Sequence, residues 1–134
     1  GTYIEKDEYF DGLDRSIKVI TDGIDAQEQP APIEIVTTTH YDDMGRKSEI
    51  YGPYFANEAE TSRYYEITTY DKLGRVDSIE TPSSVPNVPS IIYYTYDNPF
   101  TTVITDPDIK QKTEKRDHLG RIIEVIEHAD GGNM

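Results

Sequence analysis

The residues of this sequence that could do chemistry are its histidines, its arginines and its many carboxylates. His40, His118 and His128 could bind a metal ion or transfer protons, but the chain has no cysteine and no HExxH zinc motif. No serine nucleophile motif accompanies these histidines either. The sequence therefore predicts no catalytic residue, no metal ligand and no cofactor, and we expect that the chain is not an enzyme.

The carboxylates dominate the charge, since 26 acidic residues face 13 basic ones and the net charge is −13. Affinity for nucleic acid rests largely on Lys and Arg, so we expect no nucleic-acid partner. The pairs Asp22 with Asp25 and Asp106 with Asp108 could bind calcium, but neither has the ligand spacing of an EF-hand loop or a nonapeptide repeat. A solvated acidic surface is the simpler interpretation.

Four arginines belong to a repeated six-residue motif. It contains an aromatic residue, Asp, a variable residue, a large apolar residue, Gly and Arg, with Asp14 in the Gly position of the first copy and Arg116 in the aromatic position of the last. Such spacing predicts a type I turn, in which Asp accepts backbone hydrogen bonds and Gly takes a positive φ. The turn residues are Asp11 and Arg15; Asp42, Gly45 and Arg46; Asp71, Gly74 and Arg75; Asp117, Gly120 and Arg121.

The arginines of these turns could form a ligand-binding ladder. Because each recurs with its turn, we favour a structural role in which it pairs with Asp or Glu on a neighbouring strand. The apolar position of the motif is equally regular, with a large apolar side chain in all four copies. A turn exposed to water gives no reason for such a side chain. We therefore expect these side chains to be buried: Leu13, Met44, Leu73 and Leu119.

The elements that must position these turns are β-strands. Ile and Val far outnumber Leu, and strand-like segments flank each turn. A fifth, irregular turn is expected after Tyr96, and Asp106-Pro107-Asp108-Ile109 predicts a second kind of turn with Pro at its second position. The fold class is therefore all-β, with consecutive antiparallel hairpins that form a twisted sheet able to curl. We expect one segment of a larger protein over residues 1–134, with turns near 11–14, 42–45, 71–74, 97–100 and 117–120.

These motifs resemble the YD-repeat, or RHS-repeat, family, and the resemblance runs from about Phe10 to Glu127. It implies a structural segment of a secreted or cell-surface bacterial protein, in a β-shell that encloses a toxin or mediates surface contacts. The implied partners are neighbouring repeats of the parent protein, with a toxin cargo or a glycan as further candidates.

The alternative function is a carbohydrate- or protein-binding module that uses a Tyr-rich sheet face. No apolar segment reaches the roughly 20 residues of a membrane helix, so we expect no membrane insertion. Pairing in chain order would place edge strands near Tyr3–Phe10 and Arg121–His128. Such edges predict a weak homo-oligomer.

Overall fold

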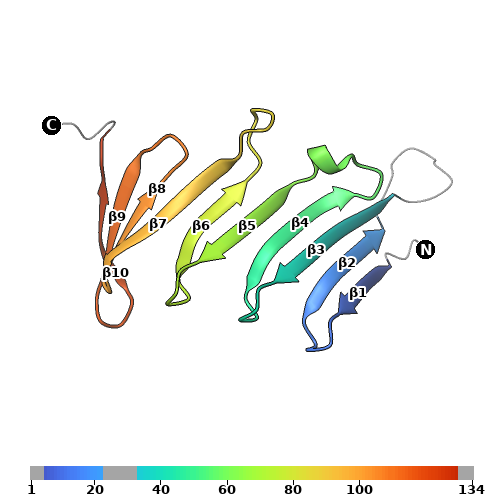
Figure 1. The fold of residues 1–134 in the computed structure, drawn as a ribbon, viewed down its shortest axis with the longest axis horizontal. Coiled ribbons are helices and arrows are strands. Elements are labelled where there is room, and N and C mark those ends of the chain that lie inside the picture. The colour runs from blue at the N-terminus through green and yellow to red at the C-terminus, as the bar shows by residue number, and fades with distance from the viewer. Residues whose placement is uncertain (1–4, 23–32, 130–134) are drawn as a thin grey trace. The chain divides into compact units, whose positions relative to one another are not determined.

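The computed structural model describes residues 5–22 and 33–129, and most of these residues lie in β-strands (Figure 1). The strands are β1 (Lys6–Phe10), β2 (Ser16–Asp22), β3 (Glu34–Tyr41), β4 (Lys47–Phe55), β5 (Tyr65–Tyr70), β6 (Val76–Thr81), β7 (Ser90–Asn98), β8 (Thr101–Thr105), β9 (Gln111–Arg116) and β10 (Ile122–Glu127). Over the described ranges the only helix is one 3-10 turn, η1 (Glu60–Ser62). No described helix has the length and apolar character needed to span a membrane.

The strands are hydrogen-bonded in chain order into one antiparallel sheet that remains open, with β1 and β10 at its ends. The all-β fold class and the consecutive hairpins predicted from the sequence are therefore confirmed. The two predicted edge strands are also confirmed where the structure describes them, while Tyr3 lies outside the described residues. Neighbouring strands follow one another through short turns because Asp and Gly recur at the same spacing.

The chain divides inside β5 into two compact units, residues 1–67 and residues 68–134, and each is described by itself. Each unit is one sheet thick in its described part, so neither face is covered by a second layer. Three described residues are buried: Val36, at 5% exposure, Thr113, at 9%, and Gly52. The other described residues are divided about equally between half-buried and exposed.

The large apolar residues of the turns are exposed, which contradicts the expectation that they are buried. Their exposed fractions lie between 66% and 78%: Leu13, Met44, Leu73 and Leu119. The reason is the single layer, because no described element packs over the tips of these turns. Regular recurrence of an apolar residue in a turn therefore did not indicate burial in this chain.

Candidate functional site

The repeated turn is built by its first residue, as the turn at Asp42 shows. The backbone closes through two hydrogen bonds, from Gly45 N to Asp42 O at 2.9 Å and from Asp42 N to Arg46 O at 2.8 Å. The Oδ1 atom of Asp42 accepts two more, from the N–H groups of Met44 and Arg46, both at 2.9 Å. Gly45 has φ +80°, a left-handed conformation that a residue without Cβ adopts easily.

The other turns repeat this geometry. Gly74 and Gly120 both have φ +81°, and Asp14, which stands in the glycine position of the first turn, has φ +59°. Asp tolerates the left-handed region better than most residues with a side chain. The prediction that these glycines have positive φ is therefore confirmed for all three.

Each turn arginine pairs with the aspartate of its own turn. In the second turn, Arg46 Nε donates to Asp42 Oδ2 at 2.8 Å and Nη2 lies 2.7 Å from the same oxygen. The corresponding Nε–Oδ2 distances in the other turns are 2.7 Å for Arg15 and Asp11, 2.8 Å for Arg75 and Asp71, and 2.7 Å for Arg121 and Asp117. The predicted pair with an acidic residue of a neighbouring strand was therefore wrong, because the four-residue spacing lets the arginine fold back on its own turn.

These contacts keep the turn carboxylates ionised. Hydrogen bonds from the guanidinium and the backbone N–H of Arg46 lower the pKa of Asp42 below its ordinary value of 3.8. At Asp117 the backbone N–H of Arg121 contributes most to the lowered pKa. At Asp11 and Asp71 desolvation is the largest single effect and raises the pKa, but the turn hydrogen bonds together outweigh it. A carboxylate with a lowered pKa is poorly suited to donate or accept protons near neutral pH.

The turn between β8 and β9 is a further copy of the same geometry, although its sequence differs. Asp106 N donates to Lys110 O at 2.9 Å, and Asp106 Oδ1 accepts from the N–H groups of Asp108 and Lys110, both at 2.9 Å. Ile109 takes the glycine position with φ +64°. The expectation of a second kind of turn was therefore wrong, because Ile at this position conceals the motif.

The irregular turn expected after Tyr96 is different. Asn98 pairs with Thr101 across a two-residue loop, and Asn98 Oδ1 accepts a 2.9 Å hydrogen bond from Phe100 N. The sequence of this turn contains no arginine.

Two turn arginines also contact a tyrosine of the next hairpin. In the first unit, the guanidinium of Arg15 lies 4.5 Å from the ring centroid of Tyr41, and Tyr41 Oη donates to Ser16 O at 2.8 Å. In the second unit, Arg75 lies 4.0 Å from the ring centroid of Tyr96, and Tyr96 Oη donates to Val76 O at 2.7 Å. We call this arrangement the Arg–Tyr contact. It joins the turn of one hairpin to the strand that enters the next turn.

The Arg–Tyr contact was not foreseen from the sequence. The sequence feature that accompanies this contact is the tyrosine directly before the turn aspartate, as in Tyr41-Asp42 and Tyr96-Asp97. The strand register explains the pairing. Lys18 is opposite Thr38 and Ser78 is opposite Tyr93, so the same registers place each tyrosine across from the arginine of the preceding turn.

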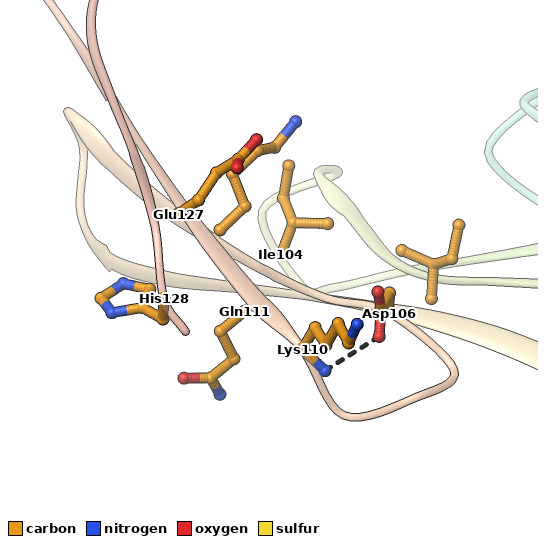
Figure 2. Close-up of a pocket in the computed structure, with 8 residues that line it drawn as sticks. Ile104, Asp106, Lys110, Gln111, Glu127 and His128 are labelled. Atoms are coloured by element: carbon orange, nitrogen blue, oxygen red, sulfur yellow. Dashed lines mark hydrogen bonds between the residues drawn. The ribbon is translucent and has the colours of Figure 1, made fainter. Parts of the chain in front are cut away.

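A depression in the second unit has a volume of about 400 Å³ (Figure 2). Ile92 and Ile104 contribute its apolar part, and polar residues of the β8–β9 turn, of β9 and of the end of β10 surround them. Asp106 accepts the Lys110 N–H of its own turn, as the dashed line in Figure 2 marks.

His128 Nε2 lies 2.9 Å from Thr113 Oγ1, and no group of three His, Asp or Glu among the described residues could hold a metal ion. His40 and His118 are exposed, and Asp25 lies outside the described part of the chain.

One face of the first unit carries a row of aromatic side chains. The register aligns Tyr9, Tyr51 and Tyr65 across β1, β4 and β5, and Tyr54 lies on the same face. We call these four residues the tyrosine face. Tyr51 contacts Tyr65 at 6.3 Å between ring centroids, and Arg63 lies 4.3 Å from the Tyr54 centroid. A shallow depression of about 330 Å³ lies beside Tyr51 and Tyr54.

The family model described as "Domain of unknown function (DUF6443)" matches residues 1–93, which is more than half of the chain. The matched range contains the turns at Asp11, Asp42 and Asp71, whereas the turn at Asp117 lies beyond it. No curated protein matches the sequence.

Proposed function

This chain belongs to the DUF6443 family, and from that premise we propose that it is a structural segment of the YD-repeat, or RHS-repeat, type. Its hairpins form part of the wall of a larger β-shell and carry no catalytic group. The parent protein is secreted or displayed on a cell surface, and the wall encloses a toxin or mediates surface contacts.

The observation that carries this proposal is the Arg–Tyr contact. It appears in both units with the same two components, a guanidinium over an aromatic ring and a phenol bound to the backbone just after that arginine. A contact that recurs between one hairpin and the next is an interface between structural repeats, which stabilises a repeating chain by nearest-neighbour terms. The motif therefore supports a role in assembly of the sheet.

The chemistry of the turn supports the same role. The Oδ1 and Oδ2 atoms of Asp42 accept hydrogen bonds from the backbone and side chain of its own turn. Its pKa is lowered, so it is held as an anion that structures the loop. The repeated polar groups make hydrogen bonds within their own turns. Folding alone therefore accounts for the recurrence of the motif, without a bound substrate.

The sequence on either side of this segment in its gene tests the proposal. We expect further hairpins with the Tyr-Asp and Gly-Arg spacing, followed by a C-terminal region of a different kind. Further repeats would also supply the neighbours that the single-layer sheet requires. Unrelated enzymatic domains directly on both sides, without further repeats, would contradict the structural proposal.

A second candidate is a carbohydrate- or protein-binding module, which the tyrosine face favours. Aromatic rings on a sheet face can stack on sugar rings, and the depression beside Tyr51 and Tyr54 adds polar groups from Glu60 and Arg63. A titration of the chain with soluble oligosaccharides, followed by NMR, would test it. Shifts centred on the tyrosine face and abolished by Tyr54→Ala, but kept in the Tyr93→Ala control, would favour this module over the shell.

A further inference from the structure

The last turn of the described chain contains an arginine that lacks the tyrosine found over two others. Arg121 makes the usual pair with Asp117, at 2.7 Å, yet 71% of its side chain is exposed. The corresponding fractions are 29% for Arg15 and 38% for Arg75, which Tyr41 and Tyr96 cover. Within the described residues, nothing covers the guanidinium of Arg121.

The strand that follows Arg121 is equally open. β10 is the last strand of the sheet, so one edge of it has no partner strand among the described residues. Three of its apolar side chains are about half exposed or more: Ile122, Ile123 and Val125. An unpaired edge of this kind offers backbone N–H and C=O groups to an incoming strand.

We propose that β10 and Arg121 form a docking site for a β-strand that ends in Tyr-Asp. The incoming strand pairs antiparallel with β10, its tyrosine ring covers the Arg121 guanidinium, and its phenol donates to the carbonyl oxygen of Ile122. This inference rests on the proposed function, since it treats β10 as continuing the interface that β2 forms with β3 and β6 forms with β7.

The register of the existing interfaces specifies the occupant. Ile79, four residues after Arg75, is opposite Ile92, which is four residues before Tyr96. Val125 stands four residues after Arg121, so the incoming strand carries an apolar or β-branched residue four positions before its tyrosine. The strand of residues 89–97 meets these requirements, with Ile92 for Val125 and Tyr96 for Arg121.

A second copy of this chain fits the same edge less well. Its free edge strand is β1, and in the register above Phe10 would lie on Arg121. Phenylalanine has no hydroxyl for the Ile122 carbonyl. The same register places Asp7 opposite Glu124, and like charges in directly opposed positions are destabilising. These features favour a Tyr-Asp strand as the occupant.

The test uses the 134-residue chain and a fluorescein-labelled synthetic peptide with the sequence of residues 89–97. Anisotropy measures the dissociation constant. We expect Arg121→Ala to weaken binding about threefold to thirtyfold, in the range of a cation–π contact. Lys72→Ala, which removes a positive charge from an exposed turn position, serves as the matched control and should leave binding unchanged. A peptide with Phe in place of Tyr96 should bind more weakly than the native peptide.

Hydrogen exchange is measured on the unmodified chain with and without the peptide. This result therefore does not depend on whether Arg121→Ala folds correctly. Binding at the proposed site should slow exchange of β10 amides and leave β1 amides unchanged. Protection at β1, no binding, or equal binding by Arg121→Ala would overturn the proposal. If the chain self-associates and Phe10→Ala abolishes this association, the β10 edge binds β1 of a second copy. The Tyr-Asp strand would then be the wrong occupant. Because these outcomes do not depend on the flanking gene sequence, the docking site and the structural role fail separately.

Discussion

The guanidinium of Arg75 lies 4.0 Å from the ring centroid of Tyr96, although 20 residues separate them in the chain. The same tyrosine donates a hydrogen bond to the carbonyl of Val76, the residue after that arginine. Burial, the largest influence on this group, raises the pKa of Tyr96, so the phenol stays protonated and remains a donor at neutral pH. Two weak contacts thus join one hairpin to the next at a fixed position.

Tyr96→Phe should reduce the free energy of unfolding by roughly 0.5–1.5 kcal/mol, the usual net contribution of one hydrogen bond. The substitution keeps the ring over Arg75 and removes only the hydroxyl. Chemical denaturation followed by circular dichroism measures the change. Tyr93→Phe is the matched control, because Tyr93 lies on the opposite face of the same strand and is half exposed. A loss in the control as large as that of Tyr96→Phe would show that the hydrogen bond contributes nothing specific.

Gly120→Ala should destabilise the chain by about 1 kcal/mol, because Ala is strained at a positive φ. A Cβ at this position would meet nothing within 4 Å, so the cost comes from backbone conformation alone. Gly12→Ala is the control, since its added Cβ also meets nothing within 4 Å and its φ is not in the left-handed region. Thermal unfolding of the two variants compares them. Equal effects would contradict the turn account.

Met44→Ala should change the free energy of unfolding by less than about 0.5 kcal/mol, because its side chain is exposed in the turn. Val36→Ala in the same unit should cost about 2 kcal/mol, since it removes buried apolar surface. Urea denaturation gives both values. A large loss for Met44→Ala would mean that the turn tip is covered in solution.

The stability advantage of the native chain over Asp42→Asn should depend on pH. The folded state lowers the pKa of Asp42, so the ionised carboxylate stabilises the fold above its unfolded pKa, near 3.8. As the pH falls through the lower folded value, the advantage should be lost. Denaturation of both proteins between about pH 7 and pH 2.5 measures it. Asp43→Asn controls for the change in net charge, and an advantage of Asp42 that persists unchanged at the acid end would contradict this account.

The sequence predicted the local part of this structure well. The spacing of Asp42 and Gly45 determines a turn through atoms only a few residues apart, so hairpins, edge strands and positive φ values followed directly. The sequence pattern predicted another kind of turn at Asp106, because Ile109 stands where the motif has glycine. Its hydrogen bonds, rather than its residue types, show that it is the same turn.

The contacts between hairpins could not be read from the sequence in the same way. Arg15 meets Tyr41 only because the pairing of β2 with β3 brings their ends together, and that register depends on the whole strand. Burial of Leu13 was predicted from its recurrence in the motif. It was wrong because burial depends on whether another layer covers the turn, which the motif does not encode.

A double-mutant cycle on Arg75 and Tyr96 tests the central claim that the Arg–Tyr contact joins successive hairpins. Arg75→Met and Tyr96→Leu each keep an apolar side chain and remove one partner, and urea denaturation of both single variants and the double variant gives the coupling free energy. The account predicts a favourable coupling of roughly 0.5–2 kcal/mol. A coupling indistinguishable from zero, with each single variant folded, would contradict it.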